Sequence, residues 1–246
     1  MIMEKITLFK FRGINKDLID TLVKGTIYCA RPIRLNDPFD CQVDIKNSAK
    51  NAISRLSGRK QETLVKLAKL KDFFDNIQNS IKSAGICSFS LVIEEPLLWS
   101  HYANEHKGLC LTYEIPFQSF FEPKKQIKGA IIPVDYGENL LTDWFIKNTP
   151  EKGKIDTKKF SNSLVEKVLS VKGTSWGYEK EVRIICSKEG SVPIPKNFLR
   201  QVCFGMNASE SDISLIKKLI ETAGYSIEYY QIKRSRQDFG IKKVKL

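Results

Sequence analysis

The chain has 246 residues, of which 42% are hydrophobic, so it is long enough and apolar enough to build a folded core. Lysine and arginine number 40 against 28 aspartate and glutamate, a formal net charge of +12. A positive surface attracts anions, so nucleotides, nucleic acid and an acidic protein acceptor are the partner classes it indicates. Solvated lysines alone account equally well for such an excess.

The cysteine and histidine content argues against a disulfide framework and a structural metal. None of the six cysteines forms a C-x-x-C pair and most lie in apolar stretches, so we expect buried, reduced thiols. Only His101 and His106 could serve as imidazole ligands. No signal peptide is recognised and no stretch is apolar for long enough to span a bilayer, so a cytoplasmic location without a membrane partner is expected.

The first predicted elements are a strand, a short helix and a second strand. Residues 5–12 alternate apolar and polar side chains, which indicates a strand. Asn15 can cap a helix over residues 16–24, and Gly25 can end it. Residues 26–30 then predict the second strand.

Residues 35–41 carry turn chemistry instead of a helical or strand period. The side chains of Asn36 and Asp37 can bond neighbouring backbone, and Pro38 keeps the residue before it extended. The same loop presents two carboxylates, Asp37 and Asp40, which can face a site.

A helical insertion is predicted over residues 48–82. Apolar side chains recur there at helical spacing, which is typical of one or two amphipathic helices outside the central sheet. The lysine run at residues 66–71 is interpreted as a solvated face.

Strand and helix patterns alternate through the rest of the chain. Strands are predicted at residues 86–91, 109–114, 130–136, 199–205 and 225–232, and helices at 94–103, in the second half of 140–172 and at 210–223. The tail at residues 233–246 holds six cations and one aspartate, so it is either a flexible end or a strip that touches a polyanion. We therefore expect a single α+β domain with a mixed, largely antiparallel central sheet.

The densest group of functional side chains lies at residues 176–186, where an aromatic loop runs into a strand. The strand period of two puts Glu179 and Glu181 on one face together with Arg183, and sends Lys180 to the other face. Two convergent carboxylates predict a catalytic edge. The alternative is an ion-pair network at the strand end, in which Arg183 is the counter-charge.

Together, several of these segments resemble a bacterial family, the domain of unknown function 2971 family. The matching segments are residues 8–12, 35–40, 86–90, 98–103, 106–108 and 176–183. They cover roughly the first three quarters of the chain. This resemblance implies no activity.

A second resemblance concerns arginine-type mono-ADP-ribosyltransferases. These enzymes present an arginine on an early strand, a Ser-x-Ser strand and a carboxylate-x-Glu turn that runs into a strand. Arg12, then Ser88 and Ser90, then Glu179 and Glu181 follow that order, although the last two motifs lie farther apart than in compact toxins of that class. The resemblance implies a split sheet of the ADP-ribosyltransferase type, with NAD as the substrate.

The resemblance also implies a role for each of these residues. Arg12 would hold the NAD phosphates, and Ser88 and Ser90 would brace the floor of the site. Glu181 would bond the ribose 2′-hydroxyl and stabilise an oxocarbenium-like transition state, while Glu179 would orient or deprotonate the acceptor.

Four aromatic and imidazole side chains complete the expected nucleotide site. Trp176 or Tyr178 would stack on the nicotinamide ring, and His101 and Tyr102 are candidates to line the pocket. The first hypothesis is thus an NAD-utilising ADP-ribosyltransferase or glycohydrolase, acting as a toxin or a phage-defence effector.

Two alternatives remain open. A non-catalytic module would grip nucleic acid through the excess lysines and arginines and through stacking aromatics. A metal-dependent nuclease would use Asp37, Asp40 and the two glutamates as ligands, although Lys180 lies between those glutamates and not after them.

Overall fold

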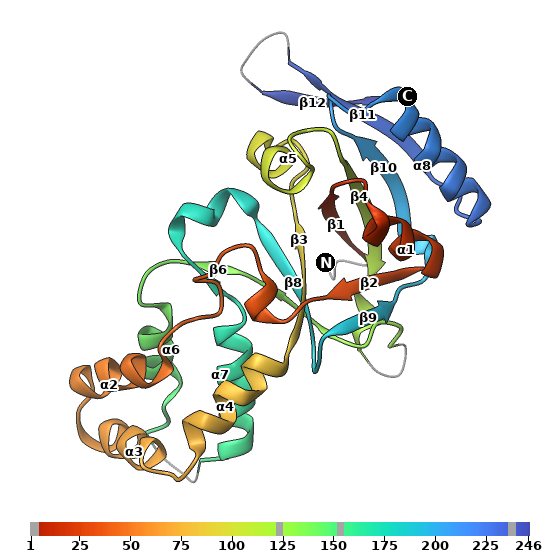
Figure 1. Cartoon of the computed structure of the whole chain (residues 1–246). Helices are drawn as coiled ribbons and strands as arrows, with labels where there is room; N and C mark the ends of the chain where they lie inside the picture. The colour runs from red at the N-terminus through yellow and green to blue at the C-terminus, as the bar shows by residue number, and fades with distance from the viewer. Residues whose placement is uncertain (1–4, 122–124, 152–154, 236–239) are drawn as a thin grey trace.

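One eight-stranded sheet organises the computed structural model, which describes residues 5–121, 125–151, 155–235 and 240–246 (Figure 1). The strand order is β12-β11-β10-β4-β1-β3-β8-β5, and every neighbouring pair is antiparallel except β10 with β11. The prediction of a mixed, largely antiparallel sheet is therefore confirmed. The strands are β1 (Lys5–Arg12), β3 (Gly85–Ser90), β4 (Leu109–Pro116), β5 (Ala130–Pro133), β8 (Glu181–Cys186), β10 (Leu199–Phe204), β11 (Glu228–Arg234) and β12 (Ile241–Lys245).

The sheet is continuous between β1 and β4 but barely joined between β1 and β3. Partners in β1 and β4 run without a break from Lys5 opposite Pro116 to Arg12 opposite Leu109. The only Cα partners that β1 and β3 share are Phe9 and Ser90. The two strands part beyond Phe9, and the candidate site lies there.

The main core lies between one face of the sheet and two helices, α1 (Lys16–Lys24) and α8 (Glu210–Thr222). Both helices have the caps that the sequence predicted. The Asn15 side chain accepts from Leu18 N at 3.0 Å, and Gly25 ends α1 at a φ of 61°, a left-handed conformation that suits glycine. Ser209 caps α8, which provides the crossover that the parallel pair β10 and β11 requires.

A second core is built mainly from helices, with Ile86 of β3 also buried in it. It contains α2 (Ile45–Arg55), α3 (Gly58–Ala68), α4 (Phe73–Ser83), α6 (Leu140–Asn148) and α7 (Thr157–Val168). These helices form a separate lobe beside the sheet (Figure 1). The segment predicted as an insertion, residues 48–82, is therefore one part of a packed helical lobe, because α6 and α7 from much later in the chain complete it.

A third, smaller cluster lies around α5 (Pro96–Tyr102). Trp99 is fully buried there and donates its indole N–H to the Ile93 carbonyl at 2.7 Å. Its ring meets that of Phe11 edge to face, with 5.1 Å between centroids. This packing fixes α5 against β1, which brings Tyr102 to the same place as the end of β3.

Two short strand pairs connect these parts. β2 (Thr26–Cys29) pairs with β9 (Gly190–Pro193), and β6 (Asp135–Tyr136) runs parallel to β7 (Val171–Lys172). The edge strand predicted over residues 130–136 is thus two strands, β5 and β6, in different sheets. β7 was not predicted, because residues 171 and 172 follow directly on a helical pattern.

The prediction for the basic tail needs correction. Residues 241–245 form β12, which pairs along β11 at the edge of the large sheet, so they are not a flexible end. The other alternative, a strip that touches a polyanion, stays a prediction. Residues 236–239, which also belong to the predicted tail, lie outside the described residues. No helix among the described residues has the length and apolar character needed to cross a membrane.

Candidate functional site

The two glutamates of the dense segment converge through a turn. Glu179 ends the 3-10 helix η3 (Thr174–Glu179), and Glu181 begins β8. Between them Lys180 has a φ of 45°, so the backbone turns left-handed there and the strand period does not extend back to Glu179. The expected strand geometry is therefore wrong at Glu179. The expected convergence is correct, because both carboxylates are buried on the same side.

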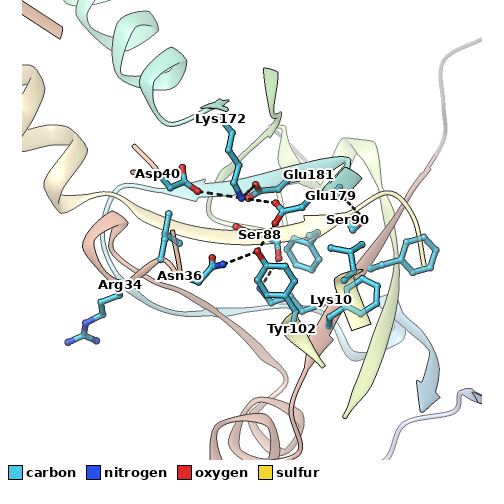
Figure 2. A pocket seen from close by; sticks show the side chains of 15 residues that line it. Lys10, Arg34, Asn36, Asp40, Ser88, Ser90, Tyr102, Lys172, Glu179 and Glu181 are labelled. Carbon is cyan, nitrogen blue, oxygen red and sulfur yellow. Dashed lines mark hydrogen bonds and ion pairs between the residues drawn. The ribbon is translucent and has the colours of Figure 1, made fainter. Parts of the chain in front are cut away.

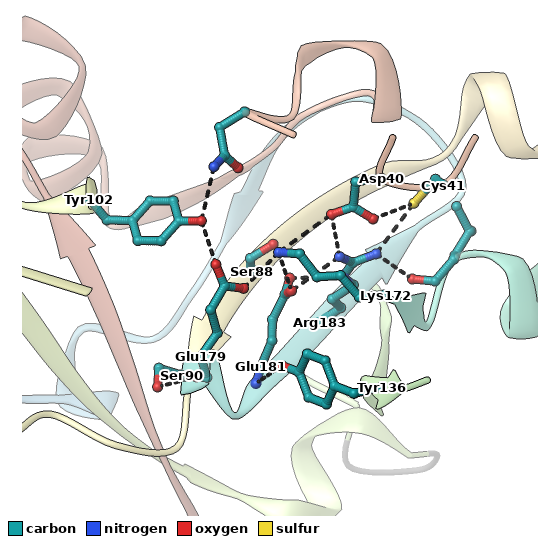
Figure 3. Close-up of polar contacts among 12 residues, drawn as sticks. Asp40, Cys41, Ser88, Ser90, Tyr102, Tyr136, Lys172, Glu179, Glu181 and Arg183 are labelled. Atoms are coloured by element: carbon teal, nitrogen blue, oxygen red, sulfur yellow. Dashed lines mark hydrogen bonds and ion pairs between the residues drawn. The ribbon is translucent and has the colours of Figure 1, made fainter. Parts of the chain in front are cut away.

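Lys172 joins these glutamates to the loop of Asp40 (Figure 3). Its Nζ lies 2.6 Å from Glu179 Oε2, 3.2 Å from Glu181 Oε2 and 3.7 Å from Asp40 Oδ2. Its side chain is only 3% exposed. Sequence reasoning missed this residue, since no local pattern distinguishes it from the many solvated lysines.

Arg183 is the second buried cation and is fully enclosed. Its Nε donates to Glu181 Oε1 at 2.8 Å, and its Nη2 donates to Asp40 Oδ2 at 2.6 Å. A third donation, from Nη1 to the Leu169 carbonyl at 2.8 Å, orients the guanidinium. The counter-charge predicted for Glu181 is thus present, and it also binds Asp40.

The network of Asp40, Lys172, Glu179, Glu181 and Arg183 contains three carboxylates and two cations. Burial of an unpaired charge costs several kcal/mol, so each member requires the others. The network therefore stabilises the junction of β8 with the loop of Asp40 and with β7. It also leaves one carboxylate in excess at a buried position.

The two glutamates differ in protonation behaviour. Burial raises the pKa of Glu179 above its usual value, against the opposing charge of Lys172. Burial also disfavours the charged form of Glu181, but Arg183 and Lys172 together hold its pKa at about 2. Tyr102 donates its hydroxyl to Glu179 Oε1 at 2.5 Å. Neighbouring carboxylates whose pKa values are pushed apart are a common acid and base arrangement.

A cavity of about 240 Å³ opens beside this network, where β1 and β3 part (Figure 2). Its apolar wall includes the rings of Phe9, Phe11 and Phe89. Its polar wall consists of Lys10, Arg34, Asn36, Asp40, Ser88, Ser90, Tyr102, Lys172, Glu179 and Glu181. The site thus combines an aromatic surface with carboxylates, hydroxyls and an amide, as small-molecule pockets do.

The serines occupy two different positions on that wall. Ser90 donates its Oγ to the Glu179 carbonyl at 2.6 Å and accepts from Val92 N at 3.0 Å, so it fixes the backbone of the catalytic candidate. Ser88 lies opposite Arg183 in the β3 and β8 pairing, and its side chain supports the charged form of Glu181.

The structure brings five of the nine predicted site residues to this cavity. They are Ser88, Ser90, Tyr102, Glu179 and Glu181. The remaining four, which do not line it, are Arg12, His101, Trp176 and Tyr178.

Arg12 is displaced from the cavity by its position on β1. It lies opposite Leu109 at the far end of the strand, beyond the contact with β3. Lys10 takes the nearer position and donates its Nζ to the Ser88 carbonyl at 2.7 Å. A phosphate-binding role for Arg12 in this cavity is therefore not supported by its placement.

Trp176 lines a second cavity of about 640 Å³ on the other side of Lys172. The Lys172 ammonium lies 4.7 Å from the centroid of the Trp176 ring. Asp40 and Lys172 line both cavities, so this pair forms the partition between them. The ring of Tyr178 lies tilted against those of Trp176 and His101, with centroids 6.1 Å and 6.5 Å away.

Asn36 is a further residue that the sequence marked only as turn chemistry. Its amide donates to the Tyr102 hydroxyl at 3.0 Å, and that hydroxyl donates on to Glu179. The loop predicted to face a site therefore does so through Asn36 and Asp40. Among the described residues no group of three or more His, Cys, Asp and Glu side chains is arranged to hold a metal ion.

The comparisons with known proteins identify a family and no activity. No curated protein and no solved structure matches the chain. The model of a family described as "Protein of unknown function (DUF2971)" matches residues 98–184, a segment that contains Tyr102, Lys172, Glu179, Glu181 and Arg183. Residues 98–184 therefore match this family, and the match contains the predicted segments 98–103, 106–108 and 176–183.

Proposed function

We propose that this protein is an NAD-utilising enzyme that cleaves the bond between nicotinamide and ribose and passes ADP-ribose to an acceptor or to water. A toxin or phage-defence effector is the biological role that we infer for it. One observation carries the proposal: Ser88, Ser90, Glu179 and Glu181, which are far apart in the sequence, line one cavity where β1 and β3 part.

The proposed chemistry assigns the ionised carboxylate to Glu181. With a pKa of about 2, Glu181 remains charged at neutral pH. Departure of nicotinamide leaves positive charge on the ribose, and a fixed carboxylate stabilises that charge in the transition state. Its Oε1 accepts from Arg183 Nε and retains acceptor capacity for a ribose hydroxyl.

Glu179 suits the proton-transfer role. Its raised pKa brings it closer to neutral pH, where a carboxyl group exchanges protons more effectively. Tyr102 and Lys172 hold its two oxygens in place, at 2.5 Å and 2.6 Å. Glu179 would therefore deprotonate the acceptor hydroxyl, amine or water that attacks the ribose.

The apolar wall suits the nicotinamide ring. Phe9, Phe11 and Phe89 offer ring faces and edges to an aromatic ligand. Arg34 is the lining cation with an exposed side chain, 64% exposed and paired with Glu189 at 2.8 Å. A guanidinium is suited to phosphate oxygens, so Arg34 replaces Arg12 as the proposed partner of the NAD phosphates.

Incubation of the purified protein with NAD tests this proposal directly. Release of free nicotinamide, followed by chromatography, is the expected result. A second incubation with labelled NAD and bacterial lysate distinguishes transfer to a macromolecule from hydrolysis. Absence of turnover in both, together with no rise in melting temperature on addition of NAD, would overturn the proposal.

A non-catalytic nucleic-acid module is the second candidate, and the hairpin of β11 and β12 favours it. Lys243 lies over the ring of Tyr230 at 4.3 Å from its centroid, and Lys242 and Lys245 are exposed beside it. Basic and aromatic side chains on one strand pair can contact both phosphates and bases. The metal-dependent nuclease stays a prediction that no observed contact favours. Lys172 and Arg183 already form ion pairs with Asp40 and Glu181, which it would need as metal ligands.

A further inference from the structure

Two cysteines from distant segments meet at the end of β8. The Sγ atoms of Cys29, the last residue of β2, and Cys186, the last residue of β8, lie 3.4 Å apart. Both thiols are free, with residue exposures of 0% and 8%. Nothing in the proposed NAD chemistry uses them, since they lie at the opposite end of β8 from Glu181.

A glycine allows this close approach. Gly85 of β3 lies opposite Cys186 in the β3 and β8 pairing. A Cβ at Gly85 would lie 2.9 Å from Cys29 Cβ and 2.4 Å from the Lys188 carbonyl oxygen, so a side chain there would push β2 away. The bridge between Ala30 and Ile86 then holds the end of β2 in place.

Cys186 is also reachable from the surface. It lines a cavity of about 450 Å³ together with Lys125, Lys128 and Gly129. A Cβ at Gly129 would lie 3.2 Å from Cys186 Sγ, so the glycine leaves the sulfur uncovered on that side. As a thiol, Cys186 donates to the Lys128 carbonyl at 3.0 Å.

The surroundings of the two thiols shift their pKa values in opposite directions. A hydrogen bond from Cys29 and the positive charge of Lys125 lower the pKa of Cys186, although burial opposes them. The same contact and burial raise the pKa of Cys29. Cys186 is thus the better nucleophile of the pair, because the thiolate is the reactive form.

We propose that Cys186 is a site of reversible oxidation by hydrogen peroxide, with Cys29 as its resolving thiol. The Cys186 thiolate attacks one peroxide oxygen, the O–O bond breaks, and the leaving hydroxide takes a proton to become water. Cys186 is then a sulfenic acid. Cys29 attacks its sulfur, an S–S bond forms, the S–O bond breaks, and the oxygen leaves as water with the proton of Cys29. The two thiols lose two electrons and peroxide is reduced to two molecules of water.

The product would link β2 to β8 across 157 positions of the chain. Beyond Cys29 the chain continues into the loop of Arg34 and Asn36, and β8 leads back to Glu181. Oxidation would therefore tie two walls of the 240 Å³ cavity together. This inference does not depend on the proposed NAD activity, and its test uses none.

The test is peroxide treatment of the reduced protein, followed by alkylation and peptide mass mapping without reductant. The expected result is one disulfide, between the peptides of Cys29 and Cys186, that dithiothreitol reverses. Cys110 and Cys203 are the internal control, because they are cross-strand partners that are also fully buried and line none of the three cavities described above. They should remain alkylatable after unfolding.

A Cys29→Ser variant sharpens the result. Without its resolving thiol, Cys186 should accumulate as sulfenic acid that dimedone labels, while circular dichroism confirms the native fold. Absence of a Cys29 to Cys186 disulfide in the wild type at peroxide doses that oxidise free glutathione would overturn the proposal. Equal oxidation of Cys110 and Cys203 would overturn it as well.

Discussion

Lys172 contacts three carboxylates, although its local sequence gives no sign of it. It lies on the two-residue strand β7, shortly after α7. Its sequence context is that of a lysine in the last turn of a helix. Glu179, Glu181 and Arg183 could be placed together from sequence because a short segment carries all of them. Lys172 and Asp40 come from other elements of the fold. Their positions beside the glutamates depend on tertiary packing, which the periodicity of a local segment does not encode.

Replacement of Lys172 tests whether the network stabilises the fold. Lys172→Met would leave Asp40, Glu179 and Glu181 with one buried counter-charge, and we expect a loss of about 3 to 5 kcal/mol in the free energy of unfolding. Urea unfolding at neutral pH measures it. The control Lys24→Met removes an exposed i, i+4 pair and should change little. Equal losses in the two variants would contradict the assigned role.

The pKa of Glu181 predicts a specific acid sensitivity. Against burial, Arg183 and Lys172 hold the pKa of Glu181 at about 2, below the usual 4.5. A carboxyl group whose pKa is lower in the folded than in the unfolded protein stabilises the fold at any pH above its unfolded-state pKa. That stabilisation is lost as the pH falls through its folded-state pKa. Glu181→Gln does not titrate, so its urea midpoint should fall less than that of the wild type between pH 4.5 and about 2. Parallel curves for the two proteins would rule out this ion pair.

Helices and strands with clear local sequence patterns were predicted well. The contacts and turns that join them were not. Alternation predicted β1, β3 and β4, and the caps at Asn15 and Ser209 predicted where α1 and α8 begin. The parting of β1 from β3 beyond Phe9 depends on which strands become neighbours, so the sequence does not reveal it. The left-handed turn at Lys180 was missed for a related reason, since lysine rarely adopts that conformation.

The helical lobe offers a prediction at the scale of elements. Leu64 on α3 is fully buried in the helical core, so Leu64→Ala should cost about 2 to 5 kcal/mol through the cavity it leaves. Amide hydrogen exchange should accelerate in α2, α3 and α4 more than in the large sheet. Leu70→Ala is the matched control, because Leu70 is 48% exposed. Uniform acceleration across sheet and helices would show that the lobe is not a separate cooperative unit.

At the scale of the molecule, the strand and helix patterns in the sequence were enough to predict the fold class. A mixed sheet and a helical segment were both predicted, because these depend on period and length. The packing of α6 and α7 onto α2, α3 and α4 was not, since it joins segments from distant parts of the chain. β12 was not predicted because its sequence, Ile-Lys-Lys-Val-Lys, shows no apolar and polar alternation.

The net charge of +12 predicts salt-dependent attraction to polyanions. A labelled single-stranded DNA should bind at low salt and lose affinity steeply between about 50 and 200 mM salt. Glu181→Gln should not alter that binding, because the carboxylate is buried away from the surface. A steep loss of affinity with salt, unchanged in Glu181→Gln, would favour the nucleic-acid module, and affinity that persisted at high salt would contradict binding through the net charge.

The central claim is that the cavity between β1 and β3 is an NAD site whose key carboxylate is Glu181. Nicotinamide release from NAD, compared among the wild type, Glu181→Gln and Glu114→Gln, tests it most directly. Glu114 pairs with Lys5 at the surface and serves as the matched glutamate control. We predict release by the wild type and Glu114→Gln, and a loss of about 100-fold or more in a folded Glu181→Gln protein. Equal release by Glu181→Gln, or none by the wild type, would contradict the account.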